Sequence, residues 1–370
     1  MIRELRVEPH LLRVELAAGG TFELHALQLR DSCPCPTCCH AGTGQRLLET
    51  DAIPLDLTIE SAIRLGDVSG TIVTWSDGHA ALFLDERLIR VGLPDRPART
   101  FWDASLAPTL PEATYEEVAG REEMLRQWLA AVEELGFAVL HGVPPEPGAV
   151  CEVAELFGHV RVTNYGRCFD VRTVADPLNL ADTSLGLGLH TDNPYREPVP
   201  GLQLLHCLEA AGAGGETVLV DGFHGVEQLR RRSPRALTLL ASTPVRFEYA
   251  SPNAVLVATT PIVELDIASA PMAIHLNNRS KRLPEVPIEL ARDWYAAYRE
   301  LTSILDEPAN QVELLLEPGD LICFDNERVL HGRKAFRGDE RRLQGCYADR
   351  DGLRSTLALL SDKEGQWAAA

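Results

Sequence analysis

The sequence predicts an α+β protein in which a small β-rich N-terminal domain precedes a jelly-roll barrel. Residues 1–97 contain short β-rich segments separated by turns, residues 115–135 and 151–157 have helical periodicity, and short strands alternate with turns after the second helix. Helices followed by many antiparallel strands are typical of an α+β fold around a barrel. We therefore expect an N-terminal domain at 1–97, a linker at 98–114 and a main domain at 115–370.

The individual elements follow from local patterns along the chain. Alternation over Ala26–Arg30 predicts a strand, and the β-rich segment Thr71–Trp75 predicts another, with a turn at Ser76–His79. The first long helix should end at the glycine that precedes a buried strand at Phe137–Leu140. A later helix is expected at 288–305 from its aromatic and apolar spacing.

The composition excludes several classes of protein. Hydrophobic residues make up 45% of the 370 residues and charged residues 24%, which fits a globular protein with a sizeable core. The formal net charge of −19 argues against nucleic acid or an anionic membrane as a partner, because both are negatively charged. No apolar run reaches membrane-spanning length, and the N-terminus lacks a signal-peptide core. We therefore expect a cytoplasmic protein.

Two histidines and one aspartate form the most informative pattern in the chain. His190 and Asp192 are two residues apart, so on an extended strand both side chains would point to the same side. His331 follows a turn, a buried strand and a polar loop, which would deliver it to a strand end. Two histidines and a carboxylate on one face of a metal are typical of non-haem Fe(II) oxygenases. The alternative is a surface polar pair near a turn.

An arginine pair follows the distal histidine. A planar guanidinium fork can pair with a dicarboxylate co-substrate. On an extended strand Arg341 shares a face with Tyr347, whereas Arg342 faces away. If Tyr347 lines the pocket, Arg341 therefore does too. Arg333 is a rival anchor, and the alternative is an exposed basic pair following Asp339–Glu340.

A cluster of cysteines near the N-terminus predicts a second metal site. Three thiolates in a tight loop shaped by prolines can reach one ion, and tetrahedral Cys₃His is a standard structural zinc set. The three thiolates are those of Cys33, Cys35 and Cys38. Candidates for the fourth ligand are His79, Cys39 and His40, although adjacent residues seldom bind one ion. The alternative is a reduced cysteine loop without metal.

Taken together, these segments resemble the γ-butyrobetaine hydroxylase branch of the Fe(II)/2-oxoglutarate dioxygenases over nearly the whole chain. The segments that carry the resemblance are Leu29–Cys35, Trp75–His79, His190–Asp192, Gly201–Cys207, Gly214–Thr217, Val220–Phe223, Phe324–Asn326, Leu330–Arg333 and Gly345–Asp349. The resemblance implies a double-stranded β-helix and a homodimer. It also implies hydroxylation of a C–H bond in a small trimethylammonium substrate, with O₂ and 2-oxoglutarate as co-substrates and succinate and CO₂ as products.

The resemblance also implies roles for particular residues. Zinc would be bound by Cys33, Cys35, Cys38 and His79, and iron by His190, Asp192 and His331. The 2-oxoglutarate carboxylate would pair with Arg341 and the Thr217 hydroxyl.

The substrate pocket should recognise a quaternary ammonium, which cannot donate hydrogen bonds and is held by aromatic faces or a carboxylate. By position, the family places cage aromatics at Tyr165, Phe169 and Tyr347, and Tyr195 would complete the cage. Asp182 departs from the animal enzyme, which has a tyrosine there, and a carboxylate would strengthen the grip on a cation. The polar candidates for the anionic end of the substrate are Asn179, Asn193, Asn277, Asn278, Arg279 and Arg196. The alternatives are ordinary core aromatics and a solvated basic loop around Arg279.

The substrate prediction depends on the anionic end. The run His190–Arg196 resembles the related 2-(trimethylammonio)ethylphosphonate hydroxylases more than γ-butyrobetaine enzymes. A phosphonate favours an arginine with several amide donors. We therefore predict hydroxylation of 2-(trimethylammonio)ethylphosphonate at the carbon bearing phosphorus, with γ-butyrobetaine hydroxylation to L-carnitine as the alternative. A taurine-type sulfonate dioxygenase and a non-catalytic zinc-binding scaffold are the remaining possibilities.

Overall fold

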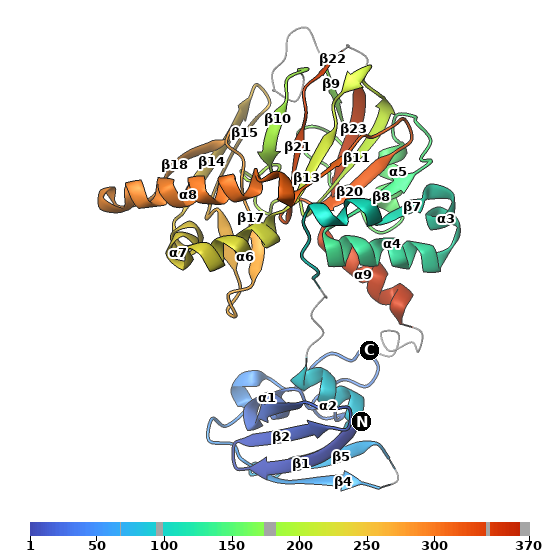
Figure 1. Cartoon of the computed structure of the whole chain (residues 1–370). Coiled ribbons are helices and arrows are strands. Elements are labelled where there is room, and N and C mark those ends of the chain that lie inside the picture. The colour runs from blue at the N-terminus through green and yellow to red at the C-terminus, as the bar shows by residue number, and fades with distance from the viewer. Residues whose placement is uncertain (67, 94–98, 174–182, 338–340, 363–370) are drawn as a thin grey trace. The chain divides into compact units, whose positions relative to one another are not determined.

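The chain forms two units, one made mainly by the residues before position 98 and the other by residues 98–361 (Figure 1). The computed structural model describes residues 1–66, 68–93, 99–173, 183–337 and 341–362. Within these ranges, no helix is both long enough and apolar enough to span a membrane.

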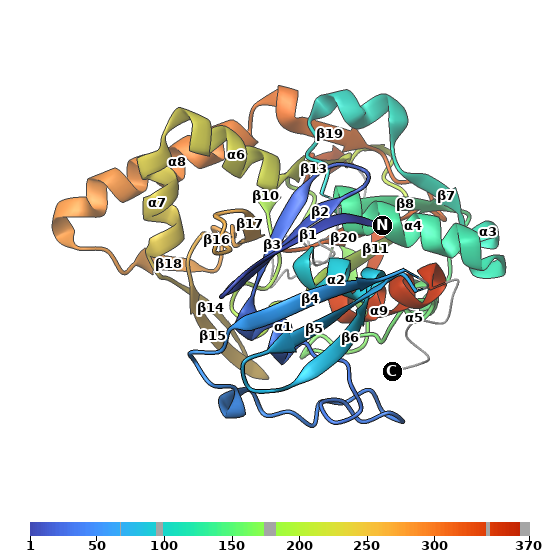
Figure 2. The same cartoon turned by 90° about the horizontal axis from the view of Figure 1, so that it is seen from below.

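The N-terminal unit contains two three-stranded antiparallel sheets, which are visible in Figure 2. Their strands are β1 (Ile2–Glu8), β2 (Leu11–Leu16), β3 (Thr21–His25), β4 (Ile59–Leu65), β5 (Gly70–Trp75) and β6 (Ala80–Leu84). The helices α1 (Ala26–Asp31) and α2 (Asp85–Gly92) each follow the last strand of a sheet. One shared core buries Leu12, Trp75 and Phe83 together with Cys33 and Cys38.

The strand predicted at Ala26–Arg30 is wrong, because these residues form helix α1. His25 caps the helix, since its ring accepts from Leu27 N and the Gln28 side chain bonds back to the His25 backbone. This capping box satisfies amide groups that an isolated helical turn would leave unpaired. Ala26 and Leu29 are buried one turn apart, so the apolar positions suit a helix as well as a strand.

Two mainly antiparallel sheets form the jelly-roll barrel of the second unit, which confirms the predicted fold class. The four-stranded sheet has the order β10 (Leu187–His190), β21 (Val329–Arg333), β13 (Thr217–Asp221) and β19 (Gln311–Leu314). The six-stranded sheet has the order β7 (Glu112–Thr114), β8 (Phe137–His141), β20 (Leu321–Asp325), β11 (Leu202–Glu209), β23 (Arg342–Ala348) and β9 (Phe169–Arg172). Both sheets contribute side chains to one core, including Leu205, Leu219 and Phe324.

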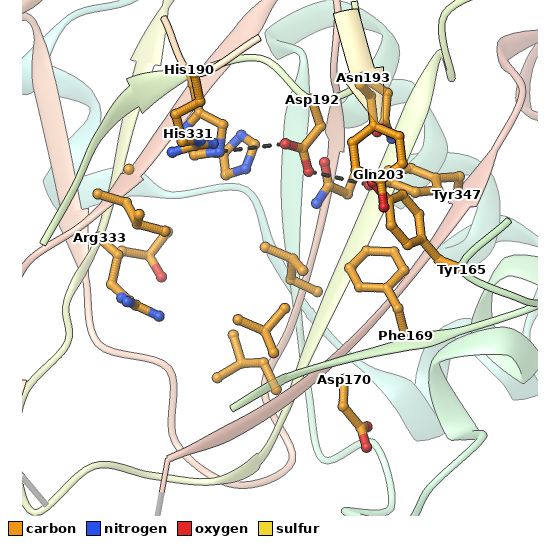
Figure 3. Close-up of a pocket in the computed structure, with 18 of the residues that line it drawn as sticks. Tyr165, Phe169, Asp170, His190, Asp192, Asn193, Gln203, His331, Arg333 and Tyr347 are labelled. Carbon is orange, nitrogen blue, oxygen red and sulfur yellow. Dashed lines mark hydrogen bonds and ion pairs between the residues drawn. The ribbon is translucent and has the colours of Figure 1, made fainter. Parts of the chain in front are cut away.

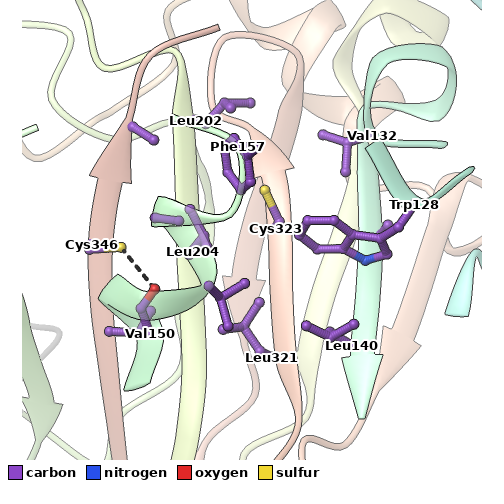
Figure 4. Packing of buried hydrophobic residues seen from close by; sticks show 14 of the residues in the cluster. Trp128, Val132, Leu140, Val150, Phe157, Leu202, Leu204, Leu321, Cys323 and Cys346 are labelled. Carbon is purple, nitrogen blue, oxygen red and sulfur yellow. Dashed lines mark hydrogen bonds between the residues drawn. The ribbon is translucent and has the colours of Figure 1, made fainter. Parts of the chain in front are cut away.

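A second core covers the other face of the six-stranded sheet (Figure 4). Trp128 and Val132 of helix α4 (Glu122–Leu135) pack on Leu140, Leu204 and Leu321 of three neighbouring strands. Successive residues of a strand face opposite sides, so in β11 Leu204 enters this core while Leu205 enters the core between the sheets. The same alternation turns Gln203 towards the inside of the barrel. Helices α5 (Ala149–Glu155) and α9 (Arg350–Ser361) also lie on this side.

A long insertion between β13 and β19 has its own core (Figures 1 and 2). It contains α6 (Gly222–Arg232), α7 (Pro234–Ser242), β14 (Val245–Ser251), β15 (Ala254–Thr260), β16 (Val263–Leu265), β17 (Pro271–Ile274), β18 (Lys281–Pro284) and α8 (Ala291–Leu305). The helix predicted at 288–305 is confirmed as α8 with a preceding 3₁₀ turn. Helices α6, α7 and α9 were not predicted.

The region predicted as one helix at 115–135 is two helices, α3 (Tyr115–Gly120) and α4. The backbone is extended at Arg121 (φ −141°, ψ 118°), directly after a glycine that favours helix poorly. Gly136 adopts φ +85° and ends α4, as expected. Part of the segment predicted as linker is structured, because β7 pairs in parallel with β8.

Candidate active site

The predicted iron ligands lie together on and beside two paired strands (Figure 3), although His331 is in the middle of its strand and not at the strand end that the sequence predicted. His190 at the end of β10 stands directly opposite His331 on β21, and their ring centroids are 4.2 Å apart. Asp192 follows β10, with its Oδ1 3.5 Å from His190 Nε2. One potential ligand atom from each of the three residues lies within 4.8 Å of the other two. The three residues that the sequence predicted as iron ligands therefore lie close together in the structure.

Buried amides hold the backbone on both sides of the aspartate. Asn326 accepts from Asp192 N at 2.7 Å and donates to Asp192 O at 2.9 Å. Asn277 donates to Thr191 O at 2.9 Å, and Leu276 N donates to the Thr191 hydroxyl at 3.0 Å. These bonds fix the loop through its main chain and leave the carboxylate free to face the histidines.

Both candidate histidines are buried, and the backbone already engages one ring nitrogen of His190. His190 Nδ1 donates to Gly188 O at 2.9 Å, so Nε2 is the ring nitrogen that faces Asp192. Burial lowers the pKa of His331 to about 3. Burial alone would raise the pKa of Asp192, but the bond to His190 and the nearby positive charges more than offset it, so its pKa lies below the ordinary value. Two neutral imidazoles and a carboxylate are the donor set that suits Fe(II).

A cavity of about 360 Å³ opens beside these residues. Arg341 and Thr217 both line it, as predicted, and Arg341 is only 6% exposed. Within the described ranges the Arg341 guanidinium makes no hydrogen bond and lies 5.5 Å from the Phe336 ring centre. Burial lowers its pKa, yet an arginine keeps its charge. A buried cation without a protein partner at a cavity wall is suited to an anionic ligand.

The rival arginines are engaged elsewhere. Arg333 lines the cavity, but its Nη2 donates to the carbonyls of Thr183 and Leu185 at 2.6 and 2.8 Å. Arg342 does not line the cavity and instead pairs with Asp170 at 3.0 Å. The strand-parity argument from the sequence therefore describes the geometry of this pair.

Aromatic side chains line one wall of the cavity (Figure 3). The Phe169 ring centre lies 5.0 Å from that of Tyr347 and 6.1 Å from that of Tyr165. The Tyr165 and Tyr195 hydroxyls are 2.9 Å apart. All four predicted cage residues thus line one cavity beside the candidate iron ligands.

Tyr249 and Gln203 are among the cavity residues that the sequence did not predict. Tyr249 of β14 stacks on Tyr195 with ring centres 5.1 Å apart and meets Tyr165 edge-on at 5.7 Å. Gln203 is 2% exposed, and its Oε1 has no hydrogen-bond partner in the described part of the chain. Gln203 lies in the segment Gly201–Cys207, which carries the family resemblance but does not by itself indicate a cavity residue. No local sequence pattern indicates Tyr249.

The candidates for the anionic end divide between the cavity and its surroundings. Asn193 and Arg279 line the cavity. Asn277 instead supports Thr191, and Asn278 is exposed outside the cavity lining. Arg196 packs its guanidinium over Tyr165 and Tyr195 at 5.6 and 5.9 Å from their ring centres. Asn179 and Asp182 lie outside the described residues.

The N-terminal cysteines gather around His79. His79 Nε2 lies 3.2, 3.5 and 3.7 Å from the sulfurs of Cys33, Cys35 and Cys38. A tetrahedral zinc with ordinary bond lengths would separate sulfur and nitrogen by about 3.5 Å, so the cluster has the dimensions of a zinc site. Cys39 points elsewhere and bonds Cys33 O at 3.2 Å.

Sequence comparison agrees with this geometry. Residues 97–347 match the family described as taurine catabolism dioxygenase TauD, TfdA family, and residues 3–85 match the γ-butyrobetaine hydroxylase-like N-terminal family. The chain belongs to the TauD/TfdA dioxygenases, in their γ-butyrobetaine hydroxylase-like branch. It is therefore an Fe(II)- and 2-oxoglutarate-dependent dioxygenase, and the resemblance seen in the sequence is confirmed.

Several relatives of this dioxygenase align over nearly its whole length. It is 37% identical to the γ-butyrobetaine dioxygenase of Pseudomonas sp. (strain AK-1), over 94% of this chain and 93% of that protein. It is 31% identical to the human γ-butyrobetaine dioxygenase, over 91% of both chains. It is 33% identical to the mitochondrial trimethyllysine dioxygenase of Rattus norvegicus, over 93% of this chain and 84% of that protein.

Proposed function

We propose that this dioxygenase hydroxylates a small substrate bearing a trimethylammonium group. The observation that carries the proposal is the aromatic wall of Tyr165, Phe169, Tyr195, Tyr249 and Tyr347 beside the histidine and aspartate cluster. Aromatic faces attract a quaternary cation that has no hydrogen to donate. The γ-butyrobetaine and trimethyllysine dioxygenases among its relatives are consistent with such a substrate.

In this proposal each group of cavity residues has its own task. His190, Asp192 and His331 hold iron, and Arg341 with Thr217 holds the distal carboxylate of 2-oxoglutarate. Iron with 2-oxoglutarate and O₂ supplies the oxidising chemistry, while the protein supplies placement and electrostatics. The aromatic wall orients the cation, and Asn193 and Arg279 are positioned to receive the anionic end.

The relatives reverse the order of the two substrates predicted from the sequence. The bacterial and human relatives that align over more than 90% of their length are γ-butyrobetaine dioxygenases, so γ-butyrobetaine becomes the leading candidate. The phosphonate analogue stays second, because Arg279 and Asn193 provide a cation and an amide at the same cavity.

The positive charge of the substrate should be indispensable. Replacing the trimethylammonium group of γ-butyrobetaine by tert-butyl keeps the shape but removes the attraction to the aromatic faces, worth ~2 kcal/mol when desolvated. We expect binding to weaken by about 30-fold, measured by competition against γ-butyrobetaine in a succinate-release assay. Equal binding of the two compounds would contradict the cage. Running 2-(trimethylammonio)ethylphosphonate in parallel ranks the two anionic groups by kcat/KM.

We further propose that Cys33, Cys35, Cys38 and His79 bind a structural zinc. Burial would raise the pKa of Cys35, but hydrogen bonds from Thr37 and the neighbouring thiols outweigh it and lower the pKa to about 6, which favours a thiolate. The four ligands come from two separate segments, so an ion would tie the cysteine loop to the turn after β5.

Removing one zinc ligand should destabilise the N-terminal unit before it affects the chemistry. We expect elemental analysis to find about one zinc per chain in the wild type after iron is removed. Cys35→Ser should lose that zinc and lower the thermal midpoint. Cys39→Ser is the matched control, because its sulfur lies outside the ligand set and should leave the zinc content unchanged. A stable wild-type protein without zinc would end this proposal.

The homodimer and the cytoplasmic location expected from the sequence stay predictions.

A further inference from the structure

Tyr347 lies where the aromatic wall meets the iron ligands (Figure 3). Its ring packs against Phe169, with centroids 5.0 Å apart and planes 31° apart. Its hydroxyl donates to Asp192 Oδ2 at 3.3 Å. The other oxygen, Oδ1, lies 3.5 Å from His190 Nε2. The two oxygens of the aspartate therefore have different partners, and one of those partners belongs to the substrate wall.

We propose that the Tyr347 hydroxyl is a positioning group that holds Oδ2 of Asp192, so that the carboxylate offers the metal a single oxygen. This inference rests on the proposed role of Asp192 as an iron ligand. A carboxylate with both oxygens free can rotate or bind a metal through both of them, which would occupy a further coordination position. Holding one oxygen keeps that position open for co-substrates.

The surroundings of Tyr347 fix the direction of its hydroxyl. On β23 it stands opposite Gln203 of β11, and the ring is 4% exposed. Gly345, two residues earlier, faces the same side, and a Cβ there would lie 2.6 Å from the Phe169 ring. The absence of that methyl group lets Phe169 lie against Tyr347. A side chain packed in this way loses little further freedom when it makes a hydrogen bond.

The hydroxyl remains a donor across the ordinary pH range. A tyrosine hydroxyl keeps its proton at neutral pH, because its ordinary pKa is about 10. The 3.3 Å separation is long for a bond between two oxygens, so its strength is at the low end for a bond to a charged group. We therefore expect that removing this hydrogen bond lowers the Fe(II) affinity only modestly.

The test compares two tyrosines of the same wall. Tyr347→Phe keeps the ring and removes the bond to Asp192, whereas Tyr165→Phe keeps its ring and removes only the 2.9 Å bond to Tyr195. Fe(II) affinity is measured anaerobically by competition with a chelator, with Asp192→Ala as the blank for other metal sites. We expect about three- to tenfold weaker Fe(II) binding in Tyr347→Phe and no change in Tyr165→Phe.

Two further readouts separate positioning from a general structural effect. γ-Butyrobetaine binding to Tyr347→Phe should weaken less than Fe(II) binding does, because the ring face remains. The ratio of succinate released to hydroxylated product should rise in Tyr347→Phe, since the reacting groups are held less well. The thermal midpoint of each variant verifies that the fold is retained.

Two outcomes would overturn the inference. One is an unchanged Fe(II) affinity in Tyr347→Phe, and the other is an equal loss in Tyr165→Phe. The Fe(II) titration contains no substrate, so it decides the role of Tyr347 even if no trimethylammonium compound binds. Failure of γ-butyrobetaine to bind the wild type would contradict only the proposed substrate class.

Discussion

Asp192→Ala should abolish coupled turnover and leave the fold intact. The substitution removes the only anionic member of the proposed iron ligand set, and two neutral imidazoles alone bind Fe(II) far more weakly. The loop should keep its conformation, because the bonds from Asn326 go to the backbone N and O of residue 192 and not to its side chain. We therefore expect product formation and Fe(II) binding to fall below detection while the thermal midpoint stays close to that of the wild type.

A second carboxylate provides the matched control. Asp170 lines the same cavity, but its oxygens bond Arg342 and Gln344, and it belongs to no metal cluster found among the described residues. Asp170→Ala should therefore keep the Fe(II) affinity of the wild type. If Asp192→Ala still bound iron and turned over substrate normally, the ligand assignment would be wrong.

The candidate iron ligands could be proposed from the sequence because part of their geometry follows from local rules. A spacing of two residues puts His190 and Asp192 on one side of an extended chain. The pairing of His331 with His190 across two strands is not local, however, and 139 residues separate Asp192 from His331. The order and combination of short motifs, compared with a known family, supplied that distant partner.

The features that the sequence did not predict are those whose structure depends on tertiary or side-chain contacts. Five residues at Ala26–Arg30 fit both a helical and an extended period, and the side-chain bond of His25 selects the helix. Tyr249 lies in the insertion between β13 and β19, so its place beside Tyr195 depends on how that insertion folds back. Asn277 was predicted to contact substrate, but an amide in a sequence does not reveal that its partner is the Thr191 carbonyl.

The two neighbouring arginines, Arg341 and Arg342, show what strand alternation can and cannot predict. Parity alone placed Arg341 with Tyr347, and both line the cavity. Parity could not predict that the loop before β13 leaves room for the Arg341 side chain. Gly215 has φ +82°, and a Cβ there would lie 3.2 Å from Arg341 Nε. This glycine therefore gives the guanidinium room in a conformation that other residues rarely adopt.

Arg341→Ala should weaken 2-oxoglutarate binding more than any other single change at the co-substrate end of the cavity. The guanidinium is buried, lacks a hydrogen-bond partner in the described part of the chain, and lines the cavity together with Thr217. Its loss would leave the distal carboxylate of 2-oxoglutarate buried without a cation. Truncating one partner of such a pair costs roughly 2–5 kcal/mol, which corresponds to about a 30-fold or larger rise in KM for 2-oxoglutarate.

Four further variants make this expectation specific. Arg342→Ala should change KM little, since Arg342 does not line the cavity and its guanidinium is paired with Asp170. Arg341→Lys should restore only part of the affinity, because an ammonium cannot offer two parallel donors to a carboxylate. Gly215→Ala should raise KM as well, since its methyl group would displace Arg341. The measurement is the initial rate against 2-oxoglutarate at saturating substrate. A large rise in KM for Arg342→Ala, with Arg341→Ala unaffected, would show that Arg342 binds the carboxylate. A large rise for Arg333→Ala alone would assign that role to Arg333.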